Sequence, residues 1–526
     1  MFTFKKALPE EVGIPSSSIK ELLLFLDKKD IPMHSMLIMR QDKLVLEKYY
    51  APYAQDTLHR MFSISKSFTA LAIFLLLEEK KITLDDSITD YFPEYVNADT
   101  HPWIKATTIK NMLMMRTCHA AATYKADMTS DWTKSFFTTL PTHKPGTVFH
   151  YDTSAAHVLC ALVEKLTGKP MLDYLKEKIL NYMDFSKESY MIKDPFGVSI
   201  GGSGLMATPM DVLKVLFLLD KKGTITCNDG IVRTLLNPEL IEKATSNLSD
   251  TIMTGPLPSE ASGYGMQIWQ NEMGGYVLYG MGGQLAISLP EKELLIMTTA
   301  DTQGIAGGNQ VIYDAIYNIL LPSIKNAPLN TIMDEKKSAY DSLVEVANFL
   351  EIAPPRMPKS RLVNPILEDL PEFIKGVANP KGANIDSADS LRDNSGNFSV
   401  LKYDLDENAQ GFSSLQLNLS HNGVSTLRLI RNDEKSTSPL QYDINFGIQN
   451  MQEGIFPKYG THYTAGAIWL RENTLYIRVH LIGECVGSVR FELFFEEKEI
   501  TVFMRKIEET YFKEFDGHLH GYLQCN

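Results

Sequence analysis

Residues 58–81 read "LHRMFSISKSFTALAIFLLLEEKK", a short polar segment followed by a long apolar run. In this segment Ser63 stands three residues before Lys66. Side chains three residues apart on a helix lie on the same side and touch. A helix that begins at Ser63 therefore brings a hydroxyl and an amine together, either as the polar start of a core helix or as a nucleophile with its base.

The second explanation is chemically sensible. A serine hydroxyl is a poor nucleophile unless a base takes its proton, and a lysine withdrawn from water can act as that base. The start of a helix also favours developing negative charge. The spacing alone is a weak signal, because Ser17 and Lys20 match it too, and we interpret that pair as a helix cap and an exposed lysine.

Length and composition indicate a multidomain globular protein. The 526 residues suggest about two to four domains. The sequence is 44% hydrophobic and 22% charged, so a sizeable core is possible. A net charge of -13 should repel nucleic acids and anionic membranes. We therefore expect neither as a partner; the sequence does not predict an oligomeric state.

The start of the chain shows no signal peptide pattern, because no apolar run follows its first positive charges. The longest apolar run, residues 70–77, is too short for a membrane helix, which needs about 20 residues. The cysteines are scattered, odd in number and form no CxxC pair, which favours a reducing compartment over disulfides or a zinc site. They are Cys118, Cys160, Cys227, Cys485 and Cys525. We expect a cytoplasmic protein without a metal or another cofactor.

The chain as far as residue 325 mixes strand and helix patterns. Residues 34–50 predict two strands around the turn "RQDK", and residues 274–301 predict two or three further strands. Between them, residues 154–168 and 204–223 have helical spacing and end in glycine. Strands at both ends with helices between them predict an α+β fold, in which both ends of the domain build one antiparallel sheet with helices packed on it.

The pattern changes after a proline-rich segment, "IAPPRMPKSRLVNPI" at residues 352–366. Beyond it, long stretches alternate apolar and polar residues and are separated by turn pairs such as "NG". We predict a first domain at 1–325, a linker at 326–366 and an all-β barrel or sandwich domain at 367–526.

Four segments, in order, resemble the serine β-lactamase and penicillin-binding-protein superfamily, most of all its class C β-lactamase-related esterases and amidases. They are "FSISKSFTALAIFLLLEEKKITLDDSITDYFPEY", "KPGTVFHYDTSAAHVLCALVEKLTGKP", "GGSGLMATPMDVLKVLFLL" and "YGMGGQLAISLPEKELLIMTTAD". The likeness covers roughly residues 8–325 and implies a β-lactamase-like first domain with an additional helical subdomain. Four ordered matches are far more specific than one SxxK.

The resemblance implies a mechanism through an acyl-enzyme. Ser63 would attack an acyl carbonyl, and Lys66 and Tyr151 would share the proton transfers. Nearby ammonium groups would favour the phenolate of Tyr151 and make it a usable base. The oxyanion would be bound by the backbone N–H groups of Ser63 and Gln284.

Two departures from the family pattern bear on the substrate. Thr153 replaces the asparagine of the second motif and lacks its two-sided hydrogen bonding. Met281, Gly282 and Gly283 stand where relatives have Lys-Thr-Gly, which removes the cation and hydroxyl that would hold a carboxylate. The two glycines are expected to leave room for a ligand. Trp269 resembles a strand residue beside the cleft, for which core packing is the default and substrate contact the alternative.

We therefore predict a serine hydrolase that acts on a small ester, or less readily an amide, with a neutral or largely apolar acyl group, rather than a β-lactamase or a cell-wall peptidase. An acyltransferase that uses the same acyl-enzyme is one alternative. A non-catalytic ligand-binding protein on the same fold is the other.

Overall fold

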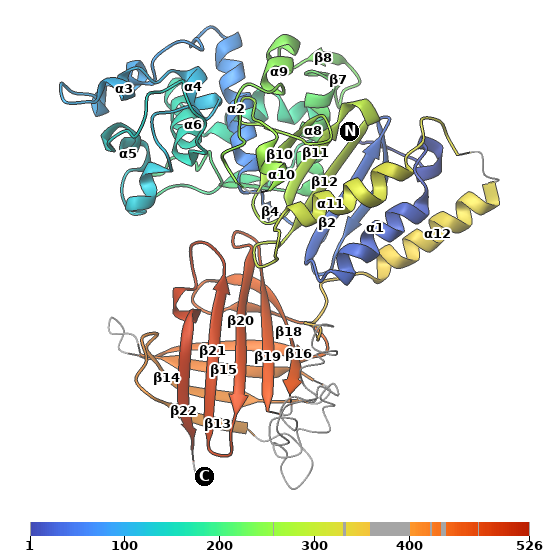
Figure 1. Cartoon of the computed structure of the whole chain (residues 1–526), viewed down its shortest axis with the longest axis vertical. Helices are drawn as coiled ribbons and strands as arrows, with labels where there is room; N and C mark the ends of the chain where they lie inside the picture. The colour runs from blue at the N-terminus through green and yellow to red at the C-terminus, as the bar shows by residue number, and fades with distance from the viewer. Residues whose placement is uncertain are drawn as a thin grey trace. The chain divides into compact units, whose positions relative to one another are not determined.

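The computed structural model describes residues 2–255, 257–329, 333–357, 400–420, 423–432, 438–471 and 473–524. The chain divides into two compact units, Met1–Leu350 and Glu351–Asn526, each with its own sheet (Figure 1).

The sheet of the first unit joins strands from both ends of that unit. Its strand order is β1-β3-β2-β12-β11-β10-β9, and all neighbours are antiparallel except β1 and β3. The early strand β2 pairs with the late strand β12, as predicted. The strands are β1 (Lys5–Lys6), β2 (Met33–Arg40), β3 (Lys43–Tyr49), β9 (Trp269–Gln270), β10 (Tyr276–Gly280), β11 (Gln284–Leu289) and β12 (Leu294–Ala300).

Helices pack on this sheet. Figure 1 shows α1 (Ser16–Lys28), α11 (Gln310–Ala315) and α12 (Met333–Phe349) side by side in front of it. Helix α8 (Pro209–Asp220) contacts β2, β11 and β12 directly. Residues 326–366, predicted as a linker, thus contain helix α12, which packs on α1 and has buried side chains at Leu343 and Ala347. Residues 358–366 of that interval lie outside the described residues.

The predicted helical subdomain is present beside the sheet. Helix α2 (Ile64–Glu78) packs against α6 (Thr153–Thr167) and α7 (Met171–Lys178). Helices α4 (Ile109–Leu113) and α5 (Trp132–Thr138) pack on α6. Helix α6 ends as predicted, because Gly168 takes the left-handed conformation with φ of 68°.

Helix α2 is the centre of this unit and is buried along nearly its whole length. Its short polar side chains make this possible, because each one bonds to a neighbouring segment. Ser65 Oγ accepts from Leu205 N at 2.9 Å. Ser67 Oγ donates to Gln267 O at 2.7 Å, and Thr69 Oγ1 to Gly201 O at 2.9 Å. These bonds fix the position of the helix start against the sheet and the subdomain.

The second unit is a closed barrel, which resolves the predicted choice between barrel and sandwich. Among the described residues its strands follow the order β16-β15-β14-β13-β22-β21-β20-β19-β18-β17, and a parallel pairing of β16 with β18 closes the ring. The interior is filled with apolar and aromatic side chains, among them Phe456, Phe491 and Phe515. The strands are β13 (Val400–Leu405), β14 (Phe412–Asn418), β15 (Ser425–Arg431), β16 (Leu440–Ile448), β17 (Gln452–Phe456), β18 (Thr461–Arg471), β19 (Thr474–Ile482), β20 (Gly487–Phe495), β21 (Glu499–Ile507) and β22 (Gly517–Leu523).

Across the part of the chain that the structure describes, no helix is both long and apolar enough to cross a bilayer.

Candidate active site

Ser63 and Lys66 meet at the start of α2. Ser63 is the N-cap residue of the helix and is half-buried. The preceding residue, Phe62, has a φ of 45°, a left-handed conformation that is unusual for a bulky side chain. Lys66 is 1% exposed, and its Nζ donates to Ser63 Oγ at 2.8 Å. The sequence spacing therefore corresponds to direct contact between the hydroxyl and the amine.

The second partner of Lys66 is a backbone carbonyl that the sequence does not single out. Lys66 Nζ donates to Gly202 O at 2.8 Å. The chain can come this close only without a side chain at that position, because a Cβ on Gly202 would lie 2.4 Å from Thr153 Cγ2. Likewise, a Cβ on Gly201 would lie 2.3 Å from Cys160 Cβ. The "GGSG" segment thus brings an acceptor to the buried lysine.

Tyr151 lies over the same lysine. Lys66 Nζ stands 4.7 Å from the centre of the Tyr151 ring. Burial raises the pKa of Tyr151 to about 12; the polar groups of Ser63 and Trp269 nearby oppose this rise, and the charge of Glu260 adds to it. The expectation that nearby ammonium groups favour the phenolate is therefore not met, because burial has the larger effect. Tyr151 is a protonated phenol at neutral pH.

Asp152, which the sequence analysis did not single out, directly follows Tyr151 in the chain. Its fully buried carboxylate is the N-cap of α6 and accepts from Ser154 N and Thr117 Oγ1, each at 2.9 Å. Burial raises the pKa of Asp152 to about 6, although these hydrogen bonds favour the ionised form. An aspartate directly before a helical pattern is a cap signal, so the sequence contained the information needed to find it.

Thr153 takes the first helical position of α6, beside Gly202. Its methyl group is the part that faces Gly202. The residue that replaces the family's asparagine thus contributes packing around the carbonyl that accepts from Lys66.

The β10–β11 hairpin approaches the start of α2 through Gly280. A Cβ on Gly280 would lie 2.5 Å from Met61 O, two residues before Ser63. The residues predicted to form the third motif, Met281 to Gly283, make the turn between β10 and β11.

The two glycines of this turn face other protein atoms on the side where a Cβ would stand. Gly282 and Gly283 have φ values of 82° and 96°, which favour glycine. A Cβ on Gly283 would lie 2.7 Å from Ala300 Cβ and 3.0 Å from Ile312 Cδ1. Backbone conformation and packing against β12 and α11 therefore explain these glycines.

The side chain of Gln284 bonds the hairpin turn to strand β12. Its side chain is fully buried, donates to Met281 O at 2.6 Å, and accepts from Ala300 N at 3.0 Å. Because these bonds engage the side chain, only the backbone N–H of Gln284 is left as a candidate donor to the oxyanion. Along β10, strand β9 pairs only with Tyr276 and Val277, so within the described residues the outer edge at 278–280 has no strand partner.

An aromatic cluster borders the site. Trp269 is 4% exposed and lies with its ring centre 5.4 Å from that of Tyr151 and 5.8 Å from that of Tyr279. Phe149 and Tyr264 pack on the other sides of the same indole. Trp269 is thus chiefly a buried packing residue between Tyr151 and Tyr279.

Tyr279 and Glu260 form a pair that sequence reasoning missed. The Tyr279 hydroxyl donates to Glu260 Oε1 at 3.0 Å. Glu260 belongs to the short helix α10 (Pro258–Ala261), and Tyr279 stands next to Gly280 on β10. Nothing in the sequence relates two residues that far apart in different elements.

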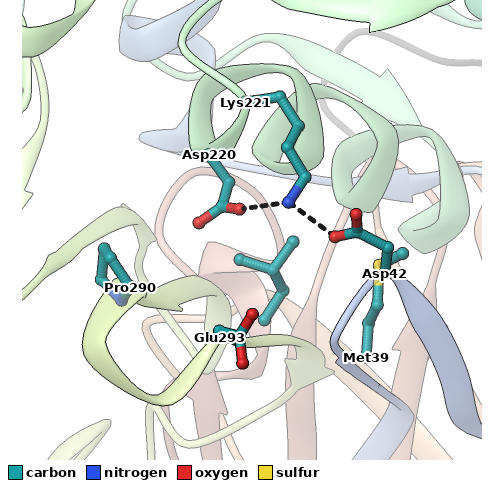
Figure 2. A pocket seen from close by; sticks show the side chains of 7 residues that line it. Met39, Asp42, Asp220, Lys221, Pro290 and Glu293 are labelled. Atoms are coloured by element: carbon teal, nitrogen blue, oxygen red, sulfur yellow. Dashed lines mark ion pairs between the residues drawn. The ribbon is translucent and has the colours of Figure 1, made fainter.

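A separate pocket contains none of the candidate catalytic residues. It is lined by Met39, Asp42, Asp220, Lys221, Pro290, Glu293 and Leu295. Figure 2 shows Lys221 between the carboxylates of Asp42 and Asp220. Its Nζ lies 2.6 Å from Asp42 and 3.5 Å from Asp220, so the charge of this lysine is already paired. Within the described residues, no group of three or more His, Cys, Asp or Glu side chains is placed to hold a metal ion.

The chain belongs to the Beta-lactamase family, whose model matches residues 24–319. It is 26% identical over 270 residues to Protein flp of Staphylococcus aureus (strain MW2), covering 45% of this chain and 53% of flp. It is 22% identical over 267 residues to the 6-aminohexanoate-dimer hydrolase of Paenarthrobacter ureafaciens, covering 48% and 68%. The chain thus spans about half the length of the flp proteins it matches.

Among solved structures, the octameric penicillin-binding protein homologue from Pyrococcus abyssi aligns with a TM-score of 0.42 and 15% identity, over 96% of this chain and 99% of that one. The family match and the sheet order together confirm the predicted α+β, β-lactamase-like first domain.

Proposed function

We propose that the chain is a serine hydrolase that cleaves a small ester, or less readily an amide, through an acyl-enzyme on Ser63. The observation that carries this proposal is the 2.8 Å contact between Ser63 Oγ and Lys66 Nζ, in a site where Lys66 is buried and lies over Tyr151. A hydroxyl held against a buried amine is the arrangement that nucleophilic catalysis requires.

In the first step Lys66, as the neutral amine, accepts the proton of Ser63 while Oγ attacks the acyl carbonyl. The bond to Gly202 O uses one N–H of the amine and holds Nζ beside Ser63, so the base step reverses the direction of the 2.8 Å Ser63–Lys66 hydrogen bond. The oxyanion accepts from the N–H of Ser63, at the helix start, and from a backbone N–H of the neighbouring hairpin.

For that second donor we favour Met281 over Gln284. Gly280, directly before Met281, is the hairpin residue in contact with Met61. In the second step Tyr151 donates its phenolic proton to the leaving group and recovers one from Lys66. A phenol that keeps its proton to about pH 12 suits this role better than that of first base. Water then hydrolyses the acyl-enzyme.

The substrate should lack the carboxylate of a β-lactam. Met281 provides no cation, and the nearby wall is aromatic, formed by Trp269, Tyr151 and Tyr279. The test is a panel of chromogenic esters of increasing acyl length together with a chromogenic cephalosporin, assayed with the wild type and Ser63→Ala.

We expect ester turnover by the wild type, its loss in Ser63→Ala, and slow turnover of the cephalosporin. Rapid cephalosporin hydrolysis would overturn the substrate assignment. Ester turnover that persists in Ser63→Ala would overturn the nucleophile. Adding alcohols and analysing the products separates hydrolysis from acyl transfer.

A further inference from the structure

The strongest feature outside the Ser63, Lys66 and Tyr151 constellation is a half-buried carboxylate at its border. Glu260 is oriented by the Tyr279 hydroxyl at 3.0 Å. The Tyr279 ring packs on Trp269, which packs in turn on Tyr151. Tyr279 also precedes Gly280, the residue in contact with the segment that leads into Ser63. Glu260 is therefore connected to Tyr151 through two successive aromatic rings, those of Tyr279 and Trp269.

The electrostatic surroundings leave the charge of Glu260 available. Among the residues that the structure describes, the Tyr279 hydroxyl donates to this carboxylate, and no lysine, arginine or histidine forms an ion pair with it. Its negative charge reaches Tyr151, whose pKa it helps to raise. The turn at Met281 adds no positive charge, and the whole chain carries -13. The border of the site is thus negative as well as aromatic.

Carboxylates and aromatic rings together are the groups that recognise organic cations. We infer that Glu260 and Tyr279 bind a positively charged ammonium group of the substrate. This inference rests on the proposed function and adds to it the charge of the substrate. An anionic substrate is disfavoured by the same carboxylate.

The test compares ester pairs that differ only in charge. One pair is acetylthiocholine and its neutral isostere S-(3,3-dimethylbutyl) thioacetate, which places the charge on the leaving group. The other pair is the p-nitrophenyl esters of 4-(trimethylammonio)butanoic and 5,5-dimethylhexanoic acids, which places it on the acyl group. The quantity measured is the ratio of kcat/KM for the cationic ester to that for the neutral one.

We expect the wild type to favour the cationic member of at least one pair by about tenfold, and Glu260→Gln to bring that ratio close to one. Glu272→Gln is the matched control. Glu272 is an exposed carboxylate that accepts from Gln310 Nε2 at 3.0 Å rather than from Tyr279, and its replacement should leave the ratio unchanged. Equal rates within both pairs for the wild type, or a preference that survives in Glu260→Gln, would overturn the inference.

A binding measurement separates this inference from the proposed hydrolysis. Choline and 3,3-dimethylbutan-1-ol are titrated into the full chain by calorimetry. Choline should bind more tightly to the wild type than the neutral alcohol does, and this difference should vanish in Glu260→Gln. If choline binds in this way but no ester is hydrolysed, the hydrolase assignment fails and the cation site stands. If esters are hydrolysed but the choline difference is absent, the cation site fails alone.

Discussion

Replacing Gly202 by alanine tests whether the acceptor of Lys66 depends on close packing. Gly202 does not have a positive φ, so its backbone tolerates alanine, and the cost comes from contacts alone. The new Cβ would lie 2.4 Å from Thr153 Cγ2 and 3.1 Å from Thr153 O. Normal carbon contacts are about 3.5–4.0 Å, so the segment or the helix must shift by about 1 Å. Overpacking of this kind costs about 1–3 kcal/mol.

The same shift would move Gly202 O away from Lys66 and should lower ester turnover. Thr153→Ser removes Cγ2, and the next nearest Thr153 atom is then the backbone oxygen at 3.1 Å. The double variant should therefore recover at least half of the stability that Gly202→Ala loses, which appears as a favourable coupling in a double-mutant cycle. Urea unfolding of the full chain measures the stability that Gly202→Ala loses and the part of it that the double variant recovers.

Two outcomes would refute this reasoning. One is a Gly202→Ala variant as stable and active as the wild type. The other is additive losses in the double variant, which would mean that Thr153 Cγ2 is not the atom that Cβ meets. Gly168→Ala is the matched control for a glycine with open space around it, since its cost comes from its positive φ and should not respond to Thr153→Ser.

Three further predictions concern Asp152, Tyr151 and Gln284. Because burial raises the folded-state pKa of Asp152 from 3.8 to about 6, its contribution to stability is complete below the unfolded value and is lost as pH rises through 6. The free energy of unfolding of the wild type relative to Asp152→Asn should thus fall by about 3 kcal/mol between pH 3 and 7, and a flat difference in pH-dependent urea unfolding would contradict it. Tyr151→Phe should lower kcat by about 10²–10⁴ in the chromogenic ester assay, and wild-type activity should show no titration of Tyr151 between about pH 6 and 9; an active phenylalanine variant would remove Tyr151 from the mechanism. Gln284→Leu leaves Met281 O and Ala300 N without their partner and should cost about 2–4 kcal/mol in urea unfolding, and a neutral result would show that the hairpin does not depend on these bonds.

Much of the fold could be predicted because its signals are local. Two strand-like segments around the polar turn "RQDK" predict β2 and β3, and Gly168 marks the end of α6. Helix α12 was missed because it is mostly polar, although Leu343, Ala347 and Leu350 repeat at helical spacing and are buried. The segment therefore contained a helix signal that its proline-rich continuation obscured.

The site was predictable to the extent that its residues share one helix or follow a family motif. Ser63 and Lys66 are neighbours on the first turn of α2, and Tyr151 precedes a helix with a recognisable cap. Gly202 O and the Glu260–Tyr279 pair depend on contacts between distant elements, which no local pattern specifies. The position of Met281 to Gly283 within the turn depends on the register of β10 and β11, which the motif alone left open.

The central claim is that Ser63 is activated by Lys66. The most direct measurement is the rate at which a fluorophosphonate probe modifies each serine, mapped by mass spectrometry in the wild type and in Lys66→Ala. Ser17 is a built-in control: it has the same spacing to Lys20 but is exposed, and Lys20 Nζ bonds to Ser342 Oγ at 3.0 Å. We expect Ser63 alone of the two to be labelled, and its labelling rate to fall by about 10²-fold or more without Lys66. Equal labelling of Ser17 and Ser63, or a rate at Ser63 that does not depend on Lys66, would contradict the account.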